Sequence, residues 1–123
     1  MIRSIFIVFA LTYFCVAGCG GDGAIELNVK IEPSVKVFKS RGSVQCTGGG
    51  TAPEVMENEL ITAGIEVRSF SCGIDGLVYA AVCGAPDGAI NIFDIPQSRT
   101  AQAQSLGFAS LSTLLDAQET QCR

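Results

Sequence analysis

The feature that most constrains this chain is the place where its N-terminal apolar run stops. Residues 5–14 are apolar apart from Thr12, and the four residues before them include Arg3. This is the layout of a secretory signal peptide, and the run is shorter than the about 20 apolar residues that a membrane-spanning helix needs. Cleavage after residue 18 would leave 105 of the 123 residues. That length suits one small domain and is too short for two ordinary ones.

The residues that follow the run, Val16-Ala17-Gly18-Cys19, resemble the lipobox of bacterial lipoproteins. The resemblance implies that Val16, Ala17 and Gly18 are recognised by the signal peptidase and that Cys19 becomes the acylated N-terminus. Residues 1–18 are then a signal peptide, and residues 19–23 a lipidated terminus with a flexible spacer. Several acyl chains would make a durable anchor, whereas a single chain holds a protein only marginally.

Two alternatives remain open: an ordinary signal peptide with a cysteine nearby, and an uncleaved N-terminal anchor. In the lipoprotein family, an Asp directly after the acylated cysteine favours retention in the inner membrane, and here that position is Gly20. The resemblance therefore implies a protein of the cell envelope, attached to the lipid bilayer through Cys19. In a bacterium with two membranes, the outer membrane is the expected location.

Cys15 would leave with the leader and Cys19 would carry lipid, so the domain keeps Cys46, Cys72, Cys83 and Cys122. An even number of cysteines in a small secreted domain predicts two disulfides, for which three pairings exist. A four-cysteine zinc site is the alternative, but the sequence has no C-x₂-C pair. We therefore expect disulfides and no metal.

The order of predicted elements indicates an α+β domain spanning residues 24–123. Alternating apolar residues predict a strand from residue 25, with residues 24–39 forming a hairpin or one interrupted edge strand. Thr51 and Glu54 have capping-box spacing around Pro53, which predicts a helix over 52–63 that ends at Gly64. The remaining predicted elements are strands at 43–46, 65–72, 77–83 and 89–95 and a helix over 97–106, closed by Gly107.

This order predicts a mainly antiparallel sheet with two helices on one side, in a split βαβ-like, disulfide-bonded arrangement. If strands 43–46 and 65–72 are parallel, Cys46 and Cys72 lie at one edge of the sheet and Cys83 at the opposite edge. A disulfide needs a Cα separation of about 4.4–6.8 Å. The predicted pairs are therefore Cys46 with Cys72 and Cys83 with Cys122.

Little in the sequence points to catalysis. The chain has no His, which excludes Ser-His and Cys-His nucleophiles and histidine metal sites. We expect no enzymatic activity and no cofactor. A net charge of −4 without a Lys/Arg cluster also argues against nucleic acid as a partner. The loose basic group Lys30, Lys36, Lys39 and Arg41 could contact anionic head groups, but the pattern favours scattered solvated strand residues.

The sequence thus predicts a membrane-tethered envelope lipoprotein that acts as a non-catalytic protein-binding or assembly accessory. A protein of the envelope is the expected partner. The alternative is a periplasmic inhibitor of a hydrolase such as lysozyme, for which a small, disulfide-rigidified, lipid-anchored domain would be suited.

Overall fold

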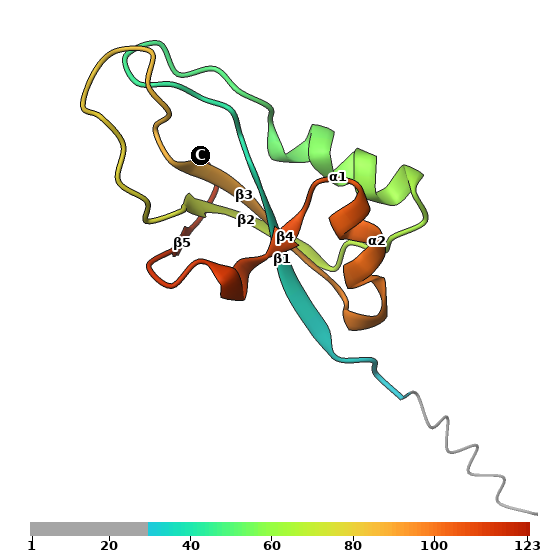
Figure 1. Ribbon diagram of the computed structural model, residues 1–123. Helices are drawn as coiled ribbons and strands as arrows, with labels where there is room; N and C mark the ends of the chain where they lie inside the picture. The colour runs from blue at the N-terminus through green and yellow to red at the C-terminus, as the bar shows by residue number, and fades with distance from the viewer. Residues whose placement is uncertain (1–29) are drawn as a thin grey trace, which may run out of the picture.

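The structure, a computed structural model, describes residues 30–123 (Figure 1). The predicted lipobox, residues 16–19, lies outside the described residues, as does most of the predicted strand that begins at residue 25. None of the helices in residues 30–123 has the length and apolarity that would let it cross a membrane.

The domain is built on a five-stranded sheet in the order β4-β1-β3-β2-β5, in which all neighbouring strands are antiparallel. Its strands are β1 (Ser34–Ser40), β2 (Ser69–Ile74), β3 (Ala89–Pro96), β4 (Ala109–Ser110) and β5 (Gln118–Thr120). Because β1 and β2 both pair antiparallel with β3, they run parallel to each other on either side of it. Helix α1 (Pro53–Thr62) joins them. This confirms the predicted α+β class and the split βαβ order.

The main core lies between the sheet and its two helices. Side chains alternate along a strand, so Val37 of β1 and Phe93 and Ile95 of β3 face the same side. On that side they pack against residues of α1, of α2 (Thr100–Ser105) and of the segment after α2, which contribute Met56, Leu60, Ala103 and Phe108. Both helices therefore cover one face of the sheet, as predicted (Figure 1).

Both helices end at the glycine that the sequence indicated. Gly64 has φ +81°, its N–H donates to Ile61, and the N–H of Ile65 donates to Leu60 at 3.0 Å. This is a Schellman motif, in which a left-handed glycine satisfies the last carbonyls of the helix. Gly107 closes α2 in the same way, with the Phe108 N–H donating to Ala103 at 3.1 Å. In each case the residue after the glycine enters the core, so helix ending and core packing are coupled.

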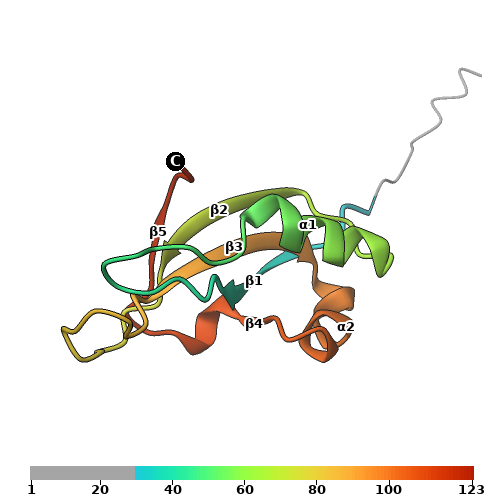
Figure 2. The same cartoon turned by 90° about the horizontal axis from the view of Figure 1, so that it is seen from above.

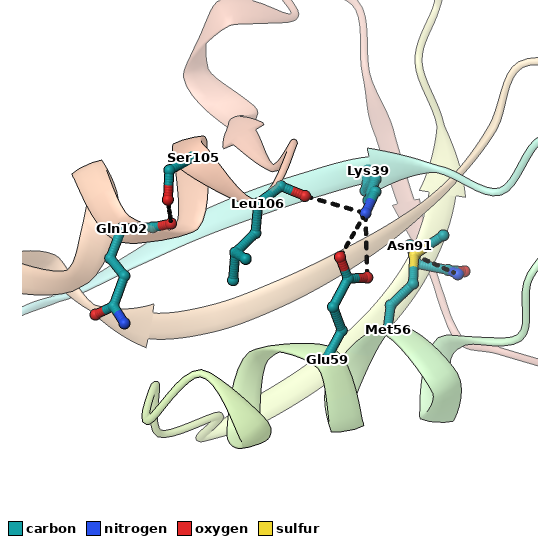
Figure 3. A network of polar contacts seen from close by, with 7 residues as sticks. All are labelled: Lys39, Met56, Glu59, Asn91, Gln102, Ser105 and Leu106. Carbon is teal, nitrogen blue, oxygen red and sulfur yellow. Dashed lines mark hydrogen bonds and ion pairs between the residues drawn. The ribbon is translucent and has the colours of Figure 1, made fainter.

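Lys39 joins the two helices to β1 (Figure 3). Its Nζ lies 2.9 Å from Oε1 of Glu59 on α1 and donates to the Leu106 carbonyl at the end of α2, 3.1 Å away. The same ammonium lies 4.8 Å from the centre of the Phe108 ring, within range of a cation–π interaction. One half-buried cation thus fixes the ends of three elements.

Asn91, which is fully buried on β3, anchors the segment before α1. Its Nδ2 donates to the Thr51 carbonyl at 3.0 Å and lies 3.3 Å from the Met56 sulfur (Figure 3 draws the Met56 contact). Its Oδ1 lies 3.7 Å from Sγ of Cys72, which is disulfide-bonded and carries no proton to donate. The opposite amide orientation would set two oxygens against each other, so the Thr51 contact fixes the assignment.

The C-terminal segment crosses the other face of the sheet, because β4 lies at one edge and β5 at the other. Glu119 of β5 accepts hydrogen bonds from Lys36 of β1 and Ser71 of β2, each at 2.6 Å. On this face Ile90 and Ile92 of β3 are buried. The central strand is therefore covered on both sides, which explains its nearly continuous apolar sequence.

Several predicted elements are corrected by the structure. Residues 43–46 form a turn with isolated bridges at Val44, and residues 77–83 belong to a loop between β2 and β3. Residues 65–68 precede β2, and Gln97–Arg99 form a 3₁₀ turn before α2. β1 is a single strand from residue 34, and the described residues 30–33 are not in a strand. The two short edge strands β4 and β5 were not predicted.

The predicted disulfide pairing is wrong: Cys46 bonds to Cys83 and Cys72 to Cys122. The prediction assumed that Cys83 ends a strand at the far edge of the sheet. Instead, the loop that carries Cys83 folds against the loop that carries Cys46, and their Cα atoms are 5.2 Å apart. Strand β5 pairs with β2, with Thr120 opposite Cys72, and this brings Cys122 to Cys72.

The predicted capping box is also corrected. Helix α1 starts at Pro53, so Ala52 is the N-cap residue, and no side chain caps the helix. Thr51 lies one residue before this N-cap position. Its carbonyl accepts a hydrogen bond from the Asn91 side chain, and its N–H donates to the Arg41 carbonyl.

Candidate functional site

The candidate site lies at one end of the sheet, in a surface that we call the loop pole: loop 41–50 together with loop 75–88. Loop 41–50 follows the end of β1, and loop 75–88 joins the end of β2 to the start of β3. The chain enters β1 from the opposite end of the sheet (Figure 2). The loop pole therefore lies at the end of the sheet opposite residues 30–33, through which the chain enters β1.

Backbone and side-chain hydrogen bonds join the two loops. The Gln45 N–H donates to Ala85 at 2.9 Å, and the Gln45 carbonyl accepts from Gly84 at 3.1 Å. The Gln45 amide also donates to the carbonyls of Ala80 and Pro86, at 2.8 and 3.1 Å. Four bonds from one residue hold loop 75–88 against its neighbour, although neither loop contains a helix or a regular strand.

The disulfide between Cys46 and Cys83 lies next to these hydrogen bonds and joins the two loops covalently. Cys46 has φ +72°, a left-handed conformation that a non-glycine residue adopts rarely and at some cost. The disulfide and the Gln45 bonds on either side of it hold the backbone in this conformation.

Two aspartates fix the ends of loop 75–88. The buried Asp75 accepts hydrogen bonds from the Leu77 N–H at 2.9 Å and the Tyr79 hydroxyl at 2.5 Å, and the latter bond raises the pKa of Tyr79. Asp87 accepts from the Ala89 N–H at 2.9 Å and the Ser43 hydroxyl at 2.8 Å, which lower the pKa of its carboxyl. Both carboxylates serve the loop and are not free to act as an acid–base pair.

The outer side of the loop is apolar. The exposed fraction is 59% for Leu77, 99% for Val78 and 58% for Val82, and Ala80 and Ala81 between them are also exposed. We call these five residues the apolar crest. No charged residue occurs between Gly76 and Pro86. Exposed apolar side chains grouped on one rigid loop commonly mark a surface that is covered by a partner.

The structure gives the cysteines of the described residues a structural role. All four cysteines of the described part of the chain are in disulfides, and no group of three or more metal-ligating side chains is found in residues 30–123. Of the predicted site residues, Cys46 and Cys83 meet at the loop pole. Cys72 and Cys122 meet at the β2–β5 edge, and Val16, Ala17, Gly18 and Cys19 lie outside the described residues.

The sequence prediction missed the apolar crest because it assigned residues 77–83 to a strand. A signal was present: residues 77–82 are apolar at consecutive positions without alternation, so a strand there would have to be buried on both faces. The domain already has one such strand, β3, and a chain of this size has little further core to cover a second.

Comparison of the sequence with known protein families and with curated proteins finds no significant match, and no solved structure matches significantly either. The functional argument therefore rests on the geometry of the loop pole and on the sequence.

Proposed function

We propose that this protein is a membrane-tethered, non-catalytic binding domain of a bacterial cell envelope, and that it contacts a protein partner through the loop pole. The tether is Cys19, acylated at the lipobox. The observation that carries the proposal is the apolar crest, displayed on a loop that a disulfide, two aspartates and Gln45 hold in one conformation.

The chemistry of the crest favours a protein partner over a bilayer. Segments that insert into a membrane surface combine apolar side chains with Trp or Phe and a Lys/Arg-rich polar face. Residues 76–86 contain no Trp, Phe, Lys or Arg, and their one aromatic residue, Tyr79, is bonded to Asp75. A compact, uncharged crest of Leu, Val and Ala fits an apolar pocket on a folded protein, and its rigidity reduces the entropy lost on binding.

The location of the loop pole is consistent with this assignment. The chain enters β1 at the end of the sheet opposite the loop pole (Figure 2), so the entering residues 30–33 do not cover the crest. The absence of His from the sequence and the structural use of Asp75 and Asp87 support a non-catalytic role.

The test is site-specific photo-crosslinking in intact cells. A photoreactive residue at Val78, which is 99% exposed on the crest, should give one discrete protein adduct. The same residue at Val55, which is 59% exposed on α1, is the matched control and should give none. Leu77→Asp, introduced in addition, should remove the adduct while the far-UV spectrum stays unchanged. Equal adducts from both positions, or lipid adducts from Val78, would refute the proposed surface.

The tether is tested separately by metabolic labelling with a clickable fatty acid. We expect the native chain to be labelled and found in the membrane fraction, and Cys19→Ala to be unlabelled. Undiminished label on Cys19→Ala would exclude acylation at this cysteine.

Inhibition of a hydrolase is the second candidate, because a protruding disulfide-closed loop can also enter a catalytic cleft. The identity of the Val78 adduct separates the two. A subunit of an envelope assembly supports the accessory role, whereas a lysozyme or related hydrolase, inhibited by the purified domain and not by Leu77→Asp, supports inhibition.

A further inference from the structure

A cavity of about 510 Å³ lies beside the Cys72–Cys122 disulfide, apart from the apolar crest. Arg41 lines one side, and the C-terminal residues Thr120 to Arg123 line the other. The volume falls within the range of about 300–1,000 Å³ that is typical of small-ligand sites. Two of its lining residues are arginines, Arg41 and Arg123, in a chain with a net charge of −4.

Neither arginine is neutralised by an ion pair within residues 30–123. The three ion pairs of this part of the chain join Lys36 to Glu119, Lys39 to Glu59 and Arg68 to Glu66. The side chains of Arg41 and Arg123 donate none of the hydrogen bonds found there, and Nε of Arg41 is buried without a partner. The described residues thus leave the hydrogen-bond donors of both guanidinium groups unused.

The acidic group whose pKa responds to Arg41 is Asp87, but the two side chains form no ion pair within residues 30–123. The Ala89 N–H and the Ser43 hydroxyl lower the pKa of Asp87 most, and the charge of Arg41 contributes least. Its Oδ1 accepts from both of those donors, at 2.9 and 2.8 Å. Asp87 therefore moderates the positive potential at Arg41 and leaves the guanidinium N–H groups unbonded.

The backbone on each side of the cavity is fixed. The Arg41 N–H donates to Ala89 at 3.0 Å, and the Arg41 carbonyl accepts from Thr51 at 2.8 Å. Gly50 lies so close that a Cβ there would be 2.6 Å from the Arg41 carbonyl oxygen. Across the cavity, the disulfide holds Cys122, and with it the adjacent Arg123, against β2.

We propose that this cavity binds a phosphate-bearing anion, with Arg41 as its main contact and Arg123 as the second positive charge. The planar guanidinium group presents paired N–H donors that match two phosphate oxygens. Two such groups attract the negative charge of a phosphate monoester, and the volume leaves room for a small substituent. The shared chemistry is the phosphoryl oxygens, whether on a small molecule or on a lipid head group. This inference does not depend on the apolar crest or on the tether.

The experiment uses ¹⁵N-labelled protein comprising residues 20–123, titrated with inorganic phosphate at constant ionic strength, with chloride as the reference anion. We expect saturable shifts of the Arg41 amide and of the amides of residues 120–123. Arg41→Ala should weaken binding by about tenfold or more, the loss expected for one charge-assisted hydrogen-bonded contact. Arg41→Lys keeps the positive charge but loses the paired N–H donors of the guanidinium group, so it should give an intermediate affinity.

Arg99→Ala is the matched control. Arg99 is exposed, bonds to Gln102 and lies after the end of β3 that is farthest from Arg41, so its loss should leave phosphate binding unchanged. The spectra themselves report whether each variant is folded. The second experiment adds vesicles of phosphatidylglycerol or of phosphatidylcholine. A lipid head group is the ligand if phosphatidylglycerol alone broadens the amide signals of Arg41 and residues 120–123 and free phosphate shifts none of them. Equal affinity of Arg41→Ala and Arg99→Ala, or no site-specific shift in either arm, would overturn the proposal.

Discussion

At the scale of single residues, the acidic side chains of this domain mainly organise backbone and neighbouring strands. Asp75 and Asp87 hold the ends of one loop, and Glu119 links three strands across the face of the sheet opposite the helices. The ion pair of Glu119 is partly exposed, with side-chain exposures of 47% for Lys36 and 37% for Glu119, so water weakens it. The contribution of this ion pair to the free energy of unfolding should be visible mainly as a dependence of that free energy on pH.

The first prediction concerns Glu119. The Lys36 hydrogen bond and then the Ser71 hydrogen bond lower its pKa from the ordinary value of 4.5. A carboxylate with a lowered folded pKa stabilises the protein above its unfolded pKa, and this contribution is lost as the pH falls through the folded pKa. Glu119→Gln should therefore be less stable than the native chain at pH 7, and the difference should shrink as the pH falls below about 4.5.

Urea denaturation between pH 7 and pH 3 measures the difference. Glu57→Gln is the control, since Glu57 takes part in no ion pair or side-chain hydrogen bond in residues 30–123. Stability curves for Glu119→Gln and the native chain that stay parallel over this range would show that the Lys36–Glu119 pair contributes nothing.

At the scale of secondary-structure elements, local signals predicted helix ends well and strands poorly. Gly64 and Gly107 were identified as helix stops because a glycine that tolerates positive φ and is followed by an apolar residue acts within a few residues of chain. The central strand β3 was found because it is apolar and bounded by Gly88 and Pro96. Such signals need no knowledge of the rest of the fold.

The failed predictions depended on long-range contacts. Residues 77–82 have the composition of a strand, but the bonds of Gln45 and the Cys46–Cys83 disulfide draw them into the loop pole. β5 has only three residues, and its pairing with β2 depends on a chain segment that crosses the whole sheet. The predicted disulfide pairing was wrong because it assumed that residues 77–83 form a strand that ends at Cys83. The sequence indicated Arg41 only as one member of a loose basic group, because the cavity beside it is completed by residues 120–123, far along the chain.

The second prediction concerns the start of α1, where Ala52 is an N-cap residue of extended conformation with no capping side chain. Ala52→Ser should supply a hydroxyl to the Glu54 N–H, since the Val55 and Met56 N–H groups already donate to the Ala52 carbonyl. This cap should raise the free energy of unfolding by about 1 kcal/mol. Thr51→Ala should change it by less than about 0.5 kcal/mol, because the Thr51 side chain caps nothing.

Chemical denaturation of the two variants is the measurement, with Ala101→Ser in α2 as the control for placing serine within a helix, where it should cost up to about 0.7 kcal/mol. A loss of 1 kcal/mol or more in Thr51→Ala, with no gain in Ala52→Ser, would restore Thr51 as the cap.

At the scale of the whole molecule, the two disulfides hold different segments of the domain. The bond between Cys46 and Cys83 closes the loop pole, where the apolar crest is displayed. The bond between Cys72 and Cys122 holds the C-terminal edge strand and one wall of the arginine-lined cavity. The core between the helices and the sheet contains no cysteine of either bond. Each bond should therefore affect its own region more than the core.

The last prediction separates these effects. The linked cysteines are 37 and 50 residues apart, so restriction of the unfolded chain alone would give similar stabilisation, about 4 kcal/mol for each bond. Replacing either pair with serine should thus lower the free energy of unfolding by comparable amounts. Non-reducing peptide mapping of the native chain should recover the pairs Cys46–Cys83 and Cys72–Cys122.

The local consequences should nevertheless differ. The Cys46→Ser/Cys83→Ser protein should gain protease cleavage and amide exchange in residues 75–88 and lose the Val78 adduct, while its phosphate affinity stays close to native. The Cys72→Ser/Cys122→Ser protein should show faster exchange in residues 118–123 and weaker phosphate binding, with a crest that still crosslinks. If both variants opened the same amides, the disulfides would be acting through global stability alone, and the apolar crest and the C-terminal wall of the cavity would not be independent units.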